Sequence, residues 1–381
     1  MTSAIEFPAH VIGLMSGTSA DGVDAALLLT DGREIATPIA HASVPYDDAL
    51  RGDILALMHG KGNIDAIADA LTETHRQAVE AVITAGAIAR ENIALIGFHG
   101  QTIEHKPDQG YTLQIGKPQW LATRTGIPVV ADFRSNDIRH GGQGAPLVPL
   151  YHAALARAMP KPVMLVNIGG VANYTWIGAG EWLEAADCGP GNALIDDWVG
   201  LHTGARCDED GDIAKRGIVH EATVKQFLRD AFFVQDRPRS LDRNHFSLDS
   251  FFPKINAQSE RRYRWEEERV RVSIQDGAAT LTAITAAAIG WSVRALPEAP
   301  RELWITGGGR HNPVLMKMIG ERAHLPVLPV EEAGWNGDML EAEAFAYLAA
   351  RSVQGLPLSL PETTGVREAV SGGVLYHPSS S

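Results

Sequence analysis

Residues 10–29 read HVIGLMSGTSADGVDAALLL, and this stretch decides the class of fold. An apolar run covers Val11–Met15, a turn of small and polar residues covers Ser16–Gly22, and a second apolar run covers Val23–Leu29. Two apolar runs on either side of a glycine-bearing turn predict a β-hairpin with a loop longer than two residues. A third strand is predicted over residues 34–44. The chain therefore opens with three antiparallel strands.

A second stretch has the same pattern. Val163–Asn167 is an apolar run, Ile168–Gly170 is a turn with two glycines, and Val171–Trp176 is the next run. A third strand is predicted near residues 181–186. In each half, segments with helical periodicity then alternate with short apolar strands, which is typical of α/β folds. The repeated opening predicts two related α/β lobes.

The length and composition fit two lobes in one packed protein. The chain has 381 residues, of which 45% are hydrophobic and 21% are charged, and this is enough for two domains with a cleft between them. We expect an N-terminal lobe of residues 1–135 plus about 354–381, and a C-terminal lobe of residues 136–353. Ligands of α/β folds bind at the ends of strands, so we expect the glycine-rich turns to face the cleft.

Charge and cysteine content exclude several classes of function. Acidic residues outnumber basic ones by 46 to 33, a net charge of −13, which argues against nucleic acid or an anionic membrane as a partner. The two cysteines, Cys188 and Cys207, have no disulfide or metal-ligand pattern. The amino terminus has no export signal, and the uncharged stretch 277–293 is too short to span a membrane and is interpreted as a buried helix. We therefore expect a cytoplasmic protein.

The turn from Ser16 to Asp24 has the residue types of a phosphate-binding loop. Such a loop needs consecutive backbone N–H groups, little side-chain bulk, and a hydroxyl or carboxylate near the metal. The Walker pattern is absent, so this is not a P-loop enzyme. The same composition also fits an ordinary polar hairpin loop, and both interpretations stay open on composition alone.

Two further glycine-rich turns follow predicted strands and precede predicted helices. In residues 187–192, DCGPGN, the glycines allow a ligand to approach the backbone and Asp187 could take a proton from a nucleophile; the alternative is a turn with a capping Asp. The triplet Gly307–Gly309 could lie against a nucleoside. Three such turns at matching places favour a ligand site over coincidence.

The remaining polar candidates are ambiguous by themselves. Asp132 and Arg134, beside the glycine-rich linker 141–149, fit either a hinge salt bridge or a clamp for a sugar. His99 directly follows a predicted strand and fits a structural or a catalytic role. Glu341 lies in the first turn of the last predicted helix, where acids are commonly placed because of the helix dipole.

Together these motifs resemble those of the anhydro-N-acetylmuramic acid kinase family. The motifs that carry the resemblance lie at residues 13–24, 97–102, 132–134, 141–149, 167–173 and 187–192. They have the order and spacing of the family, and with residues 307–312 and 341–342 they cover nearly the whole chain.

The resemblance implies two actin-like (ribonuclease H-like) lobes around a central cleft for ATP and sugar. It implies that water attacks the anomeric carbon of 1,6-anhydro-N-acetylmuramic acid, that the anhydro bridge opens, and that the released O6 takes the γ-phosphate of ATP. The products are N-acetylmuramic acid 6-phosphate and ADP, in peptidoglycan recycling. It also implies Mg²⁺ bound with ATP, without an assigned side-chain ligand, and a homodimer.

The resemblance also implies roles for single residues. Asp187 matches the catalytic base, and Glu341 matches a carboxylate that orients the attacking water. His99, Arg134 and Asn173 are expected on the sugar side. The residues expected to hold the nucleotide are Gly17, Thr18, Ser19, Asp21, Gly22, Val23, Asp24, Gly189, Gly191, Asn192, Gly307, Gly308 and Gly309.

The sequence departs from the family pattern at Cys188, where Thr is common. We expect the thiol to weaken one hydrogen bond to phosphate or metal beside the base. Residues 239–264 are individual to this chain. Two alternative functions remain: an actin-like kinase for another sugar, and a non-enzymatic ATP-dependent binding protein. The second class usually carries an extra DNA- or peptide-binding module, and the sequence has no helix-turn-helix extension.

Overall fold

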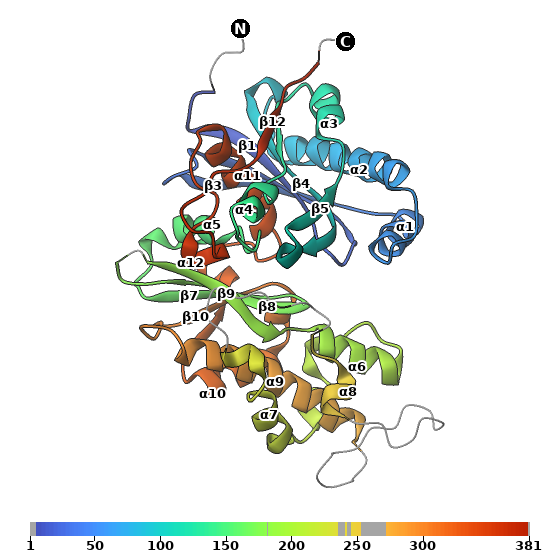
Figure 1. Cartoon of the computed structure of the whole chain (residues 1–381), viewed down its shortest axis with the longest axis vertical. Coiled ribbons are helices and arrows are strands. Elements are labelled where there is room, and N and C mark those ends of the chain that lie inside the picture. Colours follow the sequence, from blue (N-terminus) through green and yellow to red (C-terminus); the bar gives the residue numbers. More distant parts are fainter. Residues whose placement is uncertain (1–4, 181, 235–240, 242–244, 253–271, 380–381) are drawn as a thin grey trace. The chain divides into compact units, whose positions relative to one another are not determined.

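The computed structural model describes residues 5–180, 182–234, 241, 245–252 and 272–379 (Figure 1). Of the segment 239–264, most residues therefore lie outside the described part. The chain forms two compact units: residues 1–158 with 339–381, and residues 159–338. Each unit combines a β-sheet with helices, which confirms the predicted α/β fold.

The units differ from the predicted lobe boundaries in two places. Helix α11 (Leu340–Val353) packs on strands β1, β2 and β4 of the first unit, and α5 (Pro149–Leu155) packs on α11 and β3. Ten residues of α11 are buried, so this helix belongs to the core of the first unit. The sequence placed both helices in the C-terminal lobe because they are far in the chain from the strands that they cover.

In the described residues, the first unit contains a seven-stranded sheet. Its strands in spatial order are β12 (Val374–Tyr376), β6 (Val129–Ala131), β4 (Ile93–Lys106), β1 (Ala9–Ser16), β2 (Gly22–Thr30) and β3 (Ala36–Pro45), with β5 (Tyr111–Ile115) paired to β4. Strands β1, β2 and β3 are antiparallel, as predicted, whereas β4 is parallel to β1 and β6 is parallel to β4. The helices of this unit, besides α5 and α11, are α1 (Asp48–Met58), α2 (Ile64–Ala85), α3 (Pro118–Thr125), α4 (Ser135–Arg139) and α12 (Pro361–Thr364).

The second unit repeats this arrangement, with a sheet of five strands in its described part. Its strands in spatial order are β11 (Val327–Pro329), β10 (Leu303–Thr306), β7 (Val163–Ile168), β8 (Val171–Ile177) and β9 (Leu183–Pro190). Strand order and directions match those of β6, β4, β1, β2 and β3. This match confirms the predicted repeat.

The helices of the second unit are α6 (Ala193–Thr203), α7 (Glu221–Phe227), α8 (Leu248–Phe251), α9 (Ile274–Arg294) and α10 (Pro313–Ala323). Helix α9 begins at the N-cap Ser273, whose side chain accepts a hydrogen bond from the N–H of Asp276, and is buried along nearly its whole length. It is the buried helix predicted from residues 277–293. No helix in the described residues is long and apolar enough to cross a membrane.

Two glycines determine how closely α11 packs on the first sheet. A β-carbon at Gly13 in β1 would overlap the carbonyl oxygen of Ala342, and one at Gly97 in β4 would overlap that of Phe345. The backbone of α11 therefore lies directly on β1 and β4. Glu341 is in the first turn of this helix, so the same contact places its carboxylate beside the sheet.

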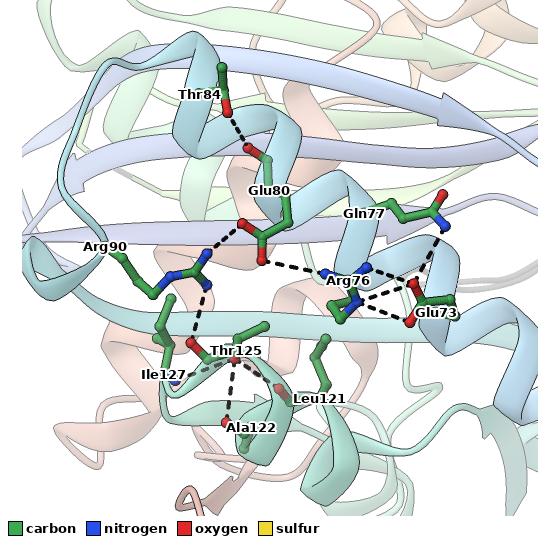
Figure 2. A network of polar contacts seen from close by, with 10 residues as sticks. All are labelled: Glu73, Arg76, Gln77, Glu80, Thr84, Arg90, Leu121, Ala122, Thr125 and Ile127. Carbon is green, nitrogen blue, oxygen red and sulfur yellow. Dashed lines mark hydrogen bonds and ion pairs between the residues drawn. The ribbon is translucent and has the colours of Figure 1, made fainter.

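A surface network of ion pairs connects α2 to the segment before β4 and to α3 (Figure 2). Arg76 pairs with Glu73 at 2.7 Å and with Glu80 at 3.6 Å, and Arg90 pairs with Glu80 at 2.5 Å. Arg90 also donates a hydrogen bond to the carbonyl of Thr125 at the end of α3. Exposed ion pairs contribute at most about 1 kcal/mol each, so this network fixes the relative placement of the helices more than it stabilises the fold.

Candidate active site

Asp187 lies inside β9, whereas the sequence predicted that the strand ends before it. Asn173 of β8 is opposite Asp187 and Ala172 is opposite Gly189, so Cys188 is an extra residue that forms a β-bulge. Bulges redirect side chains and are frequent next to active sites. The Asp187 carboxylate accepts a hydrogen bond from the backbone N–H of Leu241 at 2.6 Å, which holds its orientation.

The expectation that the Cys188 thiol lies beside phosphate or metal is wrong. The side chain is fully buried in an apolar cluster that also contains Ala186 and Tyr174. Asp187 lies between Ala186 and Cys188 and is partly exposed, so its side chain points to the other face of the sheet. The thiol is part of the core, on the face of the sheet opposite the carboxylate.

A row of polar side chains crosses the second sheet on the face of Asp187. Thr306 of β10 is next to Asn167 of β7, Asn167 is opposite Asn173 of β8, and Asn173 is opposite Asp187 of β9. Opposite residues on antiparallel strands have β-carbons roughly 4.5–5.5 Å apart. The structure therefore brings Asn173, predicted on the sugar side, beside the predicted base.

Glycine-rich turns of the second unit pack against one another through their backbones. The N–H of Gly191 donates to the carbonyl of Gly170 at 2.9 Å, and that of Asn192 donates to Gly169 at 2.8 Å. Gly307 has φ +73°, and a β-carbon there would overlap the Asn167 side chain. These contacts bring residues 189–192 and 307–309, both predicted to hold the nucleotide, into one cluster in which a β-carbon would clash at Gly191, Gly307 and Gly309.

Arg310 supports this cluster, and the sequence did not single it out. Its buried guanidinium donates to the carbonyl of Gly307 at 2.9 Å and pairs with Glu331 and Asp338, both at 2.8 Å. The N–H of Gly337 also donates to Glu331. The only signal in the sequence was a basic residue directly after a glycine triplet.

In the first unit, hydrogen bonds from buried polar side chains hold the turn between β1 and β2. Gln101 donates to the carbonyl of Gly17 at 3.0 Å and accepts a hydrogen bond from the Ser16 hydroxyl at 2.6 Å, and Tyr46 donates to Ser16 at 3.0 Å. Ala20 has φ +52°, and its N–H donates to Gly17. These hydrogen bonds were missed because β1 and β4 are far apart in the sequence.

The residues predicted to bind phosphate differ in whether their side chains are exposed. Thr18, Ser19 and Asp21 are exposed, whereas the Val23 side chain is fully buried in the core and offers only its backbone to a ligand. Asp24 is partly buried and accepts a hydrogen bond from the Ser43 hydroxyl at 2.6 Å. The turn thus exposes hydroxyl and carboxylate oxygens over a rigid base.

A charged cluster in the first unit contains Arg134, Glu341 and Asp24, and His99 adjoins it. Burial raises the pKa of Glu341; the Arg134 charge opposes this rise, and the Asp24 charge adds to it. Burial lowers the pKa of Arg134 to about 10, against the opposing effect of Glu341 and Asp137. Burial, followed by the charge of Arg134, lowers the pKa of His99 well below its usual value, so this ring is neutral.

The predicted site residues divide between the two units. The turn 17–24, His99, Arg134 and Glu341 belong to the first unit, and Asn173, Asp187, 189–192 and 307–309 belong to the second. Within each unit, the residues assigned to one role lie near each other. Among the described residues, no group of three or more His, Cys, Asp or Glu side chains could hold a metal ion by itself.

Comparison with known proteins gives a consistent result. The model of the anhydro-N-acetylmuramic acid kinase family matches residues 9–378. The protein of that name from Acidiphilium cryptum is 46% identical, over 97% of this chain and 98% of the relative. That from Zymomonas mobilis is 44% identical, over 96% and 99%.

Among solved structures, xylulose kinase from Lactobacillus acidophilus aligns with a TM-score of 0.46 and 10% identity, covering 97% of this chain and 94% of that one. The family match spans nearly all of the sequence, and the two relatives exceed 40% identity at almost full coverage. The chain therefore belongs to the anhydro-N-acetylmuramic acid kinase family.

Proposed function

We propose that the protein is an ATP-dependent kinase that opens 1,6-anhydro-N-acetylmuramic acid with water and phosphorylates O6. The observation that carries this proposal is the family match over residues 9–378, with relatives of that name at 44–46% identity. A water oxygen bonds to C1, the bond between C1 and O6 breaks, and O6 takes the γ-phosphoryl group. The products are N-acetylmuramic acid 6-phosphate and ADP, as expected for peptidoglycan recycling.

Asp187 is the proposed general base that deprotonates the attacking water. Its carboxylate is partly exposed on the polar face of the sheet and is oriented by the N–H of Leu241. A base must be held within hydrogen-bond reach of the proton that it takes, and a fixed carboxylate on a strand meets this need. Asn173, directly opposite, can hold a sugar hydroxyl or amide next to it.

Glu341 is proposed to orient the same water, and Arg134 is proposed on the sugar side. The Arg134 charge favours the ionised form of Glu341, which otherwise has a raised pKa because of burial and Asp24. An ionised carboxylate only accepts hydrogen bonds, so it would turn the hydrogens of the water toward itself and leave a lone pair for C1.

The nucleotide is proposed to lie against the glycine-rich turns. Within residues 189–192 and 307–309, Gly308 is exposed and Asn192 and Gly307 are half-buried, so a flat base and ribose could rest on the backbone there. The turn 17–24 offers backbone N–H groups and hydroxyls for the phosphates. Mg²⁺ prefers oxygen ligands and keeps several waters, and the exposed side chains of Ser19 and Asp21 would offer oxygens near the phosphates. The bound ion would neutralise charge on the transferred phosphoryl group.

The assembly and location are proposed from family membership and sequence. We propose a cytoplasmic homodimer with a small-molecule substrate and without a nucleic-acid or membrane partner. The net charge of −13 argues against a nucleic-acid or anionic membrane partner. Light scattering after size-exclusion chromatography would give twice the chain mass of 41.0 kDa, and a single-chain mass would contradict the dimer.

The reaction is tested by product analysis in ¹⁸O-labelled water. We expect ADP release with anhydro-N-acetylmuramic acid, and one solvent oxygen at C1 of the phosphorylated product. Glucose, glucosamine and N-acetylmuramic acid serve as matched acceptors. Turnover of an ordinary hexose alone would show a kinase for another sugar, and ATP binding without turnover of any sugar would favour a binding protein.

A further inference from the structure

We propose that His99 is a positioning residue that accepts a hydrogen bond from Arg134 and thereby fixes the guanidinium in the neighbourhood of Glu341. The inference rests on the proposed function only in that Glu341 takes part in the reaction. The hydrogen bond itself is a property of the folded chain and can be tested without turnover.

The hydrogen bonds determine the tautomer of His99. Arg134 Nε donates to His99 Nε2 at 3.1 Å, and an arginine nitrogen has no acceptor role, so Nε2 carries no proton. His99 Nδ1, 2.9 Å from the carbonyl oxygen of Gly100, is therefore the protonated nitrogen and donates to it. Both ring nitrogens are used within the protein, so the ring has no polar atom left to bind a sugar in this arrangement.

The backbone of β4 and the packing on α11 fix the position of the His99 ring. Between Leu14 and Ser16 of β1 there is one residue, whereas β4 has two between the partners Phe98 and Gln101, so His99 and Gly100 form a bulge. Gly100 has φ +73°, a conformation that favours glycine. The ring packs on Phe345 of α11 with centroids 4.5 Å apart, and His99 is only 5% exposed.

Arg134 is held at a second point on the opposite side. Its Nη1 donates to the carbonyl of Gly144 at 2.6 Å, and the N–H of Gly144 donates to Asp137 at 2.6 Å. Thr364 donates to the other oxygen of Asp137. Two fixed acceptors, one ring nitrogen and one carbonyl, therefore define the plane of the guanidinium.

This plane matters because Arg134 is the group that opposes protonation of Glu341. In the described part of the chain, Arg134 and Asp24 act on the pKa of Glu341, and Glu341 and Asp137 act on the pKa of Arg134. Around the His99 ring, the titratable groups are Arg134, His75 and His105. If Arg134 loses its acceptor and moves, burial and Asp24 act on Glu341 with less opposition, and its pKa rises. At a given acidic pH a larger fraction of Glu341 is then protonated.

The kinetic test compares two substitutions of His99. His99→Gln keeps an acceptor oxygen near the place of Nε2, and His99→Leu removes it. We expect kcat/KM of His99→Leu to fall about 10- to 100-fold, the range for a hydrogen bond to a charged group, with the acidic limb of the pH profile displaced to higher pH. His99→Gln should stay within about threefold of wild type, the size of a small hydrogen-bond distortion, with the limb unmoved.

His75→Leu is the matched control, because His75 is also buried in the first unit but its Nδ1 donates a hydrogen bond to the carbonyl of Leu71. It should leave the pH profile unchanged. An unmoved acidic limb in His99→Leu, or equal displacement in His99→Gln, would contradict the positioning role.

A second measurement is independent of the reaction and of how well the Leu variant folds. In wild-type protein with ¹⁵N-labelled histidine, the His99 resonances, assigned with the Gln variant, should show a protonated Nδ1 and a bare Nε2 from pH 8 to pH 5.5. A protonated Nε2 would overturn the inference. If wild type does not turn over the anhydro sugar, the proposed function fails, while the tautomer still decides whether His99 holds Arg134.

Discussion

At the scale of single residues, the proposed role of Asp187 depends on which face of β9 its side chain lies on. Regular pairing with β8 places Asp187 on the polar face, opposite Asn173, and at the bulge that follows it the Cys188 thiol lies in the core. The local sequence could not show this, because DCGPGN fits a capped turn equally well. Whether β9 ends before Asp187 or continues through it depends on pairing with β8, which is a property of the fold.

Asp187→Asn should keep nucleotide binding and lose turnover. The amide has nearly the shape of the carboxylate but cannot take a proton, and loss of a general base typically lowers kcat by about 10²–10⁴. Calorimetric ATP titration and steady-state kinetics would measure the two effects. Asp197→Asn, an exposed acid on α6, is the control and should behave as wild type. Undiminished turnover in Asp187→Asn would refute the base assignment.

A second residue-scale prediction concerns acid stability. Burial lowers the pKa of His75 from 6.5 to about 4 in the folded chain. The unfolded chain therefore binds the proton first, and the free energy of unfolding falls as the pH drops from about 6.5 to about 4. His75→Leu removes this contribution, which is on the order of 3 kcal/mol over that window.

Urea unfolding at pH 7 and pH 4.5 would measure the effect as a smaller loss of stability in His75→Leu than in wild type. Wild type and variant should both retain part of the slope, because the pKa of buried His152 is also lowered to about 4. Parallel losses in the two proteins would show that His75 is not buried in its neutral form.

At the scale of elements, the sequence was informative where a segment carries its own pattern. The β1–β2 hairpin and helix α9 were predicted from apolar runs that need no partner to be recognised. Strands β5, β11 and β12 were missed, because three to five residues are too few to carry a recognisable pattern. The bulges in β4 and β9 were not predicted, because they are defined by the register with a partner strand.

The contact between α11 and the sheet yields a prediction of its own. Gly97→Ala introduces a β-carbon that overlaps the carbonyl of Phe345 and lies 3.0 Å from the β-carbon of Ala349, so α11 must move. Such overpacking costs about 1–3 kcal/mol of stability, and kcat should fall as well because Glu341 begins the same helix. Urea unfolding and initial-rate kinetics would measure both.

Gly52→Ala in α1 is the matched control, because a β-carbon there meets nothing within 4 Å. It should be neutral or stabilise the helix by up to about 1 kcal/mol. Equal stability changes in the two variants would mean that the close approach of α11 does not limit the packing at Gly97.

At the scale of the whole molecule, the sequence predicted two related lobes, and the matching strand orders of the two sheets confirm this duplication. The boundaries differed because α5 and α11 bury their apolar faces on strands distant in sequence. The position of a helix in the chain predicts its domain only when the helix packs on strands that are close to it in sequence. The predicted site residues are divided between the two units.

Binding of MgATP should stabilise the whole protein. A ligand that binds only the folded chain at one hundred times its Kd adds about 2.7 kcal/mol to the free energy of unfolding. Tm should therefore rise with MgATP in thermal melts. With ATP and excess EDTA the rise should be smaller, because the phosphates of a net-negative chain then lack a neutralising cation. An identical rise with and without EDTA would argue against Mg²⁺ as part of the complex.

The burial of Cys188 has a practical consequence for following this enzyme in solution. The chain has two cysteines, and the other, Cys207, is exposed. A maleimide dye would therefore attach at one place without engineering. Burial and the nearby carboxylates of Asp196, Glu209 and Asp208 raise the pKa of the Cys207 thiol, so mildly alkaline labelling is favourable. The unaltered protein thus carries its own attachment point for fluorescence measurements of ligand binding.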